Sequence, residues 1–182
     1  MKRRLVWIAL VSLFVLCSTA LPVLAAEKMM KSEKAFVKDA ASGGMMEVQL
    51  GQMAQQKGAA QEVKDFGQRM VTDHGKANDG LESIVTKKRM KLPAKMADKH
   101  KKVVDKLANL SGPDFDKKYA VEMVKDHTKD VNKFRKMSGK LKDPELKGWV
   151  DKTLPVLEKH LQHAKDMAQK LGVEVKVKEK TK

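Results

Sequence analysis

The sequence predicts an all-α protein: a four-helix bundle with an extra short crossover helix between the second and third long helices. Between residues 27 and 172, apolar residues recur every three or four positions, which is the helical period, and no segment alternates with period two. Prolines and glycines divide this pattern into four long segments and one short segment. Two hairpins of long helices joined by a longer connection make a one-crossover bundle, and the folded domain is expected over residues 32–171.

The first 25 residues are predicted to be a secretory signal peptide. They combine a basic start at residues 2–4, an apolar run over residues 5–16 and a small-residue cleavage site that ends at Ala25 or Ala26. The alternative is an uncleaved anchor, because the apolar segment is long enough to span a bilayer. A cleaved signal predicts a protein of the periplasm, free or associated with the outer membrane.

The first two long helices are expected over about residues 32–57 and 60–89. The stretch "KGAA", residues 57–60, is a short connection between them. Pro93 ends the second helix, because the residue before a proline avoids helical backbone. The short helix follows over residues 94–110, with lysines on its outer side and few apolar residues to bury.

The third long helix is expected over residues 113–138 and the last over residues 144–171, and each opens with a proline in its first turn. Asp143 is the expected cap of the last helix. Pro155 lies inside that helix, and a kink is expected there rather than a break, because the apolar stripe stays in phase across it. Residues 172–182 are predicted to be a basic tail.

The charge of the chain favours anionic partners. The formal net charge is +15 and falls to +12 when the three basic residues of the signal are removed. Such a charge suits an anionic envelope surface, lipid or lipopolysaccharide, although a solvated lysine face is the simpler interpretation. Nucleic acid is not an expected partner, because the cations are almost all lysine and the aromatic residues sit at core spacing. The single cysteine, Cys17, leaves with the signal, which excludes disulfides and thiolate sites from the mature chain.

A repeated Asp-His pair marks the candidate site. The stretch "MVTDHGK", residues 70–76, is followed by "MVKDHTK", residues 123–129. Three histidines and one glutamate fall near the middle of the apolar stripes of the four long helices: Glu47, His74, His127 and His160. In a bundle such side chains converge at about one height, which is how metal sites are built in these folds.

Two interpretations of this cluster stay open. The four side chains are candidate ligands of one divalent metal ion, iron, zinc, manganese or copper, among which the ligand set does not choose. Alternatively they form a buried hydrogen-bond network without metal. Asp73 and Asp126 are expected to point toward an adjacent helix and to fix an imidazole tautomer from behind, because neighbours on a helix lie about 100° apart. Gly43 and Gly44 leave room for a bulky neighbour such as an imidazole.

Four stretches resemble a known family: "FVKDAASGGMMEVQLGQMAQQK", "VKDFGQRMVTDH", "FDKKYAVEMVKDH" and "TLPVLEKHLQHA". They are similar to the bacterial exported family known as domain of unknown function 4142, described as ferritin-like and often labelled an outer-membrane protein. The resemblance covers about residues 32–171. It implies a ferritin-like bundle and an exported protein, without a settled activity. The residues that match the family's motif positions are Glu47, Asp73, His74, Asp126, His127 and His160.

The motifs favour a binding protein over an enzyme. The Glu-x-x-His pair that ferritin-like di-metal sites use is missing, which argues against an oxidoreductase. Phosphate loops and nucleophile motifs are missing too. Methionine is abundant, but the methionines sit at core spacing rather than in a copper-binding tract. The predicted function is an exported binding protein with a polar core site; the alternative is an envelope interaction protein that binds anionic lipid or lipopolysaccharide, with structural histidines.

Overall fold

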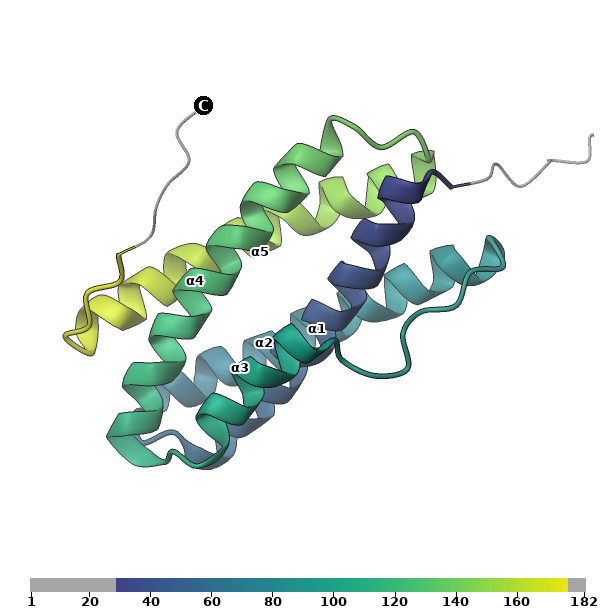
Figure 1. Cartoon of the computed structure of the whole chain (residues 1–182). Helices are drawn as coiled ribbons and strands as arrows, with labels where there is room; N and C mark the ends of the chain where they lie inside the picture. Colours follow the sequence, from purple (N-terminus) through teal and green to yellow (C-terminus); the bar gives the residue numbers. More distant parts are fainter. Residues whose placement is uncertain (1–28, 177–182) are drawn as a thin grey trace, which may run out of the picture.

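The computed structural model describes residues 29–176, which form five α-helices and no strand. The helices are α1 (Lys31–Lys57), α2 (Gln61–Lys87), α3 (Asp98–Ala108), α4 (Gly112–Ser138) and α5 (Pro144–Lys170). The pairs α1–α2 and α4–α5 are hairpins, and α3 lies in the crossover between them (Figure 1). The predicted ferritin-like bundle with a short crossover helix is confirmed. The predicted signal peptide and residues 177–182 of the predicted tail lie outside the described residues.

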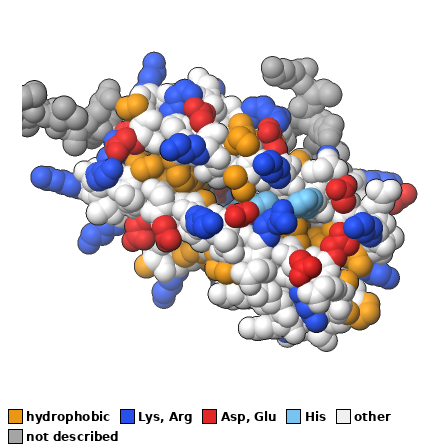
Figure 2. Space-filling model, turned by 180° about the vertical axis from the view of Figure 1, so that it is seen from behind, with side chains coloured by type: hydrophobic (Ala, Val, Ile, Leu, Met, Phe, Trp, Pro, Cys, Tyr) orange, Lys and Arg blue, Asp and Glu red, His pale blue; other side chains and the backbone are white. Residues whose placement is uncertain are grey.

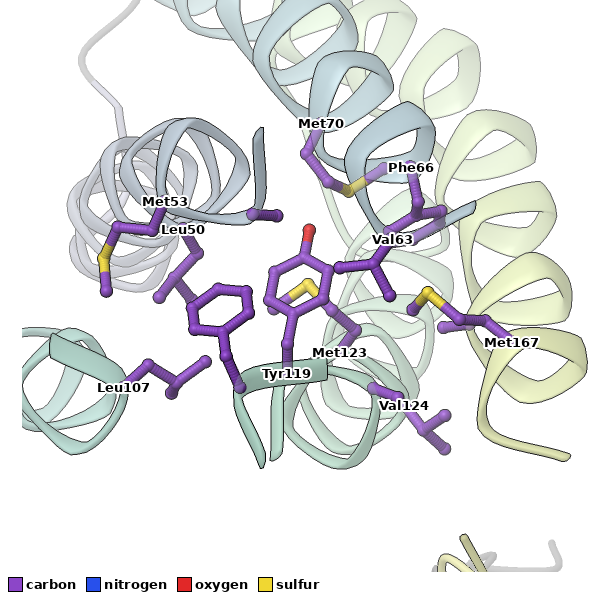
Figure 3. Packing of buried hydrophobic residues seen from close by; sticks show 14 of the residues in the cluster. Leu50, Met53, Val63, Phe66, Met70, Leu107, Tyr119, Met123, Val124 and Met167 are labelled. Atoms are coloured by element: carbon purple, nitrogen blue, oxygen red, sulfur yellow. The ribbon is translucent and has the colours of Figure 1, made fainter. Parts of the chain in front are cut away.

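The core consists of two apolar clusters. One joins the end of α1, the start of α2, the start of α4 and the end of α5 with α3, and Figure 3 shows its side chains packed around Tyr119. The other fills the opposite end of the bundle around Phe36, Phe134 and Leu157. Five methionines are buried in the first cluster: Met46 and the four at core spacing, Met53, Met70, Met123 and Met167. All five fill the core, as the spacing of the last four indicates.

Glycines bring α1 and α2 into close contact. A Cβ atom on Gly51 would lie 2.5 Å from the carbonyl oxygen of Gly67, and a Cβ on Gly67 would lie 2.6 Å from that of Gly51. Real Cβ atoms do not approach oxygen this closely. The two backbones can therefore pack at this distance only because both residues lack a side chain.

Two buried carboxylates hold loops to distant helices. Glu33 of α1 accepts a hydrogen bond from the backbone N–H of Lys142, in the loop between α4 and α5, at 2.9 Å. Asp116 of α4 accepts from the N–H groups of Ala59 and Ala60, between α1 and α2, at 3.0 and 2.8 Å. Each bond satisfies loop N–H groups and ties one hairpin to the other.

The ends of α5 agree with the signals in the sequence. The Asp143 carboxylate accepts from the N–H of Leu146 at 2.9 Å, as an N-cap does. Gly172 has a φ of 68° and follows the C-cap residue Leu171, the position where a left-handed glycine closes a helix. The chain continues through Pro155 as one helix rather than two.

The surface carries both signs of charge. Figure 2 shows the face made by α2 and α5, where lysine and arginine side chains alternate with aspartate and glutamate. None of the helices within residues 29–176 is both long enough and apolar enough to span a bilayer. Binding to an anionic envelope surface stays a prediction.

Candidate metal centre

Three histidines converge in the middle of the bundle. His74 comes from α2, His127 from α4 and His160 from α5, and all three side chains are buried. Their ring centroids lie 5.4–5.6 Å apart. One ring nitrogen from each lies within 4.8 Å of those of the other two. The helical stripes therefore deliver three imidazoles to one point, as the sequence indicates.

Two of the rings are held from behind by groups that act only as hydrogen-bond acceptors. The Nδ1–H of His127 donates to the backbone carbonyl of Met123 at 3.0 Å. The Nε2–H of His160 donates to the Asp73 carboxylate at 2.9 Å. Because a carbonyl and a carboxylate accept hydrogen bonds, these contacts fix the tautomers. The lone pairs of His127 Nε2 and His160 Nδ1 are then free, which is the usual arrangement behind metal-binding histidines.

Half of the described buried polar atoms without a partner belong to this trio of histidines. In the described part of the chain, six buried side-chain atoms have no hydrogen-bond partner: Glu47 Oε1 and Oε2, His74 Nε2, Tyr119 Oη, His127 Nε2 and His160 Nδ1. Buried polar groups in native proteins are nearly always paired. No side chain or backbone group of the described residues pairs with the three imidazole nitrogens, so these nitrogens are available to a ligand.

Burial keeps the imidazoles neutral. Burial lowers the pKa of His74 well below its ordinary value, and the charges of His127 and His160 lower it further. Burial, followed by the charge of His160, lowers the pKa of His127 to about 4. The pKa of His160 is also lowered by burial, although Asp73 partly opposes the shift. Neutral imidazole is the form that binds metals.

Glu47 and Asp126 lie outside this trio. Glu47 is buried on α1 but is not in the group of ligand atoms within 4.8 Å. Burial raises its pKa well above the ordinary value, and the charge of Asp126 raises it further. Asp126 makes no hydrogen bond to a histidine within the described residues, since His127 uses the Met123 carbonyl instead. The sequence groups Glu47 with the histidines, whereas the structure sets it beside the other carboxylate.

Asp73 connects the trio to solvent. It crosses from α2 to α5 to reach His160, so the aspartate does point to an adjacent helix, and the ring it holds is not its neighbour His74. Its side chain is 32% exposed, whereas that of His160 is 2% exposed. A shallow hollow lined by Asp73, Trp149 and Thr153 lies on this seam. Water and small ions can thus reach the carboxylate that holds the buried His160 ring.

A fourth buried histidine, His100, was not identified from the sequence. His100 of α3 accepts a hydrogen bond from the Ser42 hydroxyl at 2.6 Å, and Ser42 in turn accepts from the N–H of Ala97 at 2.8 Å. A Cβ on Gly43 would lie 3.7 Å from this ring, so the expected imidazole neighbour of Gly43 is His100. The neighbour of Gly44 is Asn78 instead. The small residues of "SGG" were the available signal: Ser42 and Gly43 contact His100 of α3, and Gly44 contacts α2.

The family follows from the match over nearly the whole described fold. A model of the family described as Domain of unknown function (DUF4142) matches residues 18–167. The chain belongs to this family. The match covers all four long helices except the last residues of α5, and it does not test whether the protein is bacterial or exported.

One solved structure shares the fold of this DUF4142 chain. It is described as CopM in the Cu(II)-bound form, with a TM-score of 0.66 and 17% sequence identity. The similarity covers 76% of this chain and 96% of the CopM chain. At this identity the likeness shows a common fold. A comparison with curated proteins gives no match.

Proposed function

We propose that this DUF4142 protein binds one divalent transition-metal ion through His74, His127 and His160. The observation that carries the proposal is that one ring nitrogen of each of the three buried histidines lies within 4.8 Å of those of the other two. Each of these histidines also has a buried ring nitrogen without a hydrogen-bond partner. Nitrogens bound tetrahedrally to zinc-sized ions lie about 3.4 Å apart, so small ring movements would close the site. Three protein ligands leave a coordination position for water or another ligand.

The ligand set favours copper or zinc. Imidazole suits Cu(II), Zn(II), Fe(II) and Ni(II), and among divalent ions of this row Cu(II) binds most tightly. The neighbour CopM was solved with Cu(II) bound, which supports trying copper first. Because the three rings are neutral, the bound ion keeps its full charge. We infer that the protein holds the ion in the envelope as a binding protein, in keeping with the predicted signal peptide.

The first test is the metal content of the mature protein. We expect untagged residues 26–182, purified without chelator and incubated with Cu(II) or Zn(II), to hold one ion per chain at the trio by mass spectrometry. His127→Gln should lose that ion, because it removes one of three ligands. His163→Gln is the matched control: His163 is an exposed histidine of the same bundle, bonded to Arg69 at 3.2 Å, and the control should keep the ion. Equal metal content in both variants would contradict the proposal.

A second prediction concerns the aspartate behind His160. Asp73→Ala should weaken metal binding by about 10- to 100-fold, because the Asp73 carboxylate orients the ring and raises its basicity. Competition with a chromophoric chelator measures the affinity. Asp79→Ala, at an exposed position of the same helix, serves as the control and should bind like the wild type. An unchanged metal affinity in Asp73→Ala would show that the Asp73–His160 hydrogen bond does not contribute to metal binding.

A further inference from the structure

The acidic side chains along the contact between α1 and α4 follow a regular register. At one end of this contact, Lys133 Nζ lies 2.5 Å from Asp39 Oδ2, and the contacts that follow show that the two helices run antiparallel. One turn along, a Cβ on Gly43 would lie 3.9 Å from Asp130 Oδ2. The next turn on each helix places Glu47 opposite Asp126. The charge of Asp126 acts on Glu47, which agrees with this register.

Cations neutralise only one end of this row. Lys133 contacts both Asp39 and Asp130, and Lys99 also contacts Asp39. At the other end, no lysine or arginine of residues 29–176 forms an ion pair with Glu47 or Asp126. Two facing carboxylates without a cation repel each other, and burial increases the cost.

Glu47 is the second, independent sign of a ligand. Its side chain is 1% exposed, and neither carboxylate oxygen has a hydrogen-bond donor other than the facing Asp126 carboxyl, which can pair with it only when one of the two is protonated. The hydroxyl oxygen of Tyr119 also lacks a partner, and Figure 3 shows it directed away from α4 toward Met70. Neither a lysine nor a neighbouring N–H supplies what these oxygens need.

We propose that Glu47 and Asp126 hold a second divalent cation, of the oxygen-preferring class of Mg²⁺ and Mn²⁺, between α1 and α4. Such ions take one or two carboxylates and keep several waters. Asp126 is only half-buried, so waters can complete the coordination from its side. The cation shares no ligand with the histidine trio, which prefers softer ions. This proposal and the proposed function can therefore fail separately.

The test uses the mature protein with Zn²⁺ already bound at the trio and Mn²⁺ as the probe. Electron paramagnetic resonance counts free Mn²⁺ during a titration. We expect one Mn²⁺ per chain in the wild type, and binding weaker by about tenfold or more in Glu47→Gln, because the variant loses a charged ligand. Zinc content should stay at the wild-type value in this variant. Glu82→Gln makes the same change at an exposed position of α2 and should bind Mn²⁺ like the wild type.

Three results would overturn the second site. The first is that the zinc-loaded wild type binds no Mn²⁺. The second is that Glu47→Gln binds Mn²⁺ with unchanged affinity. The third is that Glu47→Gln loses zinc and Mn²⁺ together, because that loss would indicate one shared site. Folding of the variant is checked by chemical unfolding without metal, where Glu47→Gln should be at least as stable as the wild type because it removes a buried acid. If it does not fold, Asp126→Asn, at a half-buried position, repeats the same comparison.

Discussion

Acidification from pH 6.5 to pH 4 should destabilise the metal-free protein through its buried histidines, and His127→Gln should remove much of that effect. Burial holds the pKa of His127 at about 4, with a further contribution from the charge of His160, whereas an unfolded histidine titrates near 6.5. Between these values the unfolded chain binds a proton that the folded chain does not. The free energy of unfolding therefore falls as the pH falls, by about 1.4 kcal/mol per pH unit and about 3 kcal/mol in total for His127.

Two carboxyl groups act in the opposite direction. Burial, followed by the charge of Asp126, raises the pKa of Asp130 to about 6, and the same two causes raise that of Glu47. On acidification, these groups bind protons at a higher pH in the folded state than in the unfolded state. Their contribution to the free energy of unfolding therefore falls as the pH rises through their folded pKa values. The wild-type slope is thus a difference between histidines and carboxyls, and only the comparison with a variant isolates His127.

The measurement is urea unfolding of metal-free wild type and His127→Gln at several pH values from 4 to 7. The difference in unfolding free energy between the two proteins should change by about 3 kcal/mol over this range, because only the wild type carries the buried imidazole. Two parallel curves would show that His127 is already protonated, or accessible to protons, in the folded state. In that case the ring would not be the neutral ligand that the metal site requires.

The helices and the histidine trio were predictable because both depend on helical period. A stripe of apolar positions indicates which side of a helix is buried. His74, His127 and His160 lie on such stripes near the middle of their helices. The stripe does not state how far one helix is rotated or shifted against the next. Glu47 satisfies the same pattern, yet the register of α1 against α4 sets it opposite Asp126 rather than in the trio.

Contacts between distant positions were less visible in the sequence. Asp73 holds His160 across 87 positions, and nothing local to either residue pairs them. His100 sits on a lysine-rich short helix with a weak apolar stripe, and it is buried because Ser42 of α1 receives it. Glu33 and Asp116 are acidic residues that look solvent-exposed by composition, but they are buried because loop N–H groups need acceptors.

The glycine contact between α1 and α2 gives the second large expected effect. Gly67→Ala should lower the free energy of unfolding by roughly 3 kcal/mol, the upper part of the range for overpacked cores. The new Cβ would lie 2.6 Å from the Gly51 carbonyl oxygen and 2.7 Å from the Cβ of Ala54. Neither atom belongs to a flexible side chain that could swing away. The two helices would have to separate, and the cost exceeds the gain in helix propensity of about 1 kcal/mol.

Gly75→Ala is the matched control on the same helix. Nothing lies within 4 Å of a Cβ at Gly75, so this variant should gain stability by up to about 1 kcal/mol through helix propensity alone. Guanidinium unfolding of the metal-free proteins measures both changes. Both variants replace a glycine of α2 by alanine. Opposite signs of their changes in unfolding free energy would therefore follow only from the close approach of α1 to α2. If Gly67→Ala were as stable as Gly75→Ala, α1 and α2 would not be in backbone contact at Gly51, and the rotation of α1 that sets Glu47 opposite Asp126 would need to be revised.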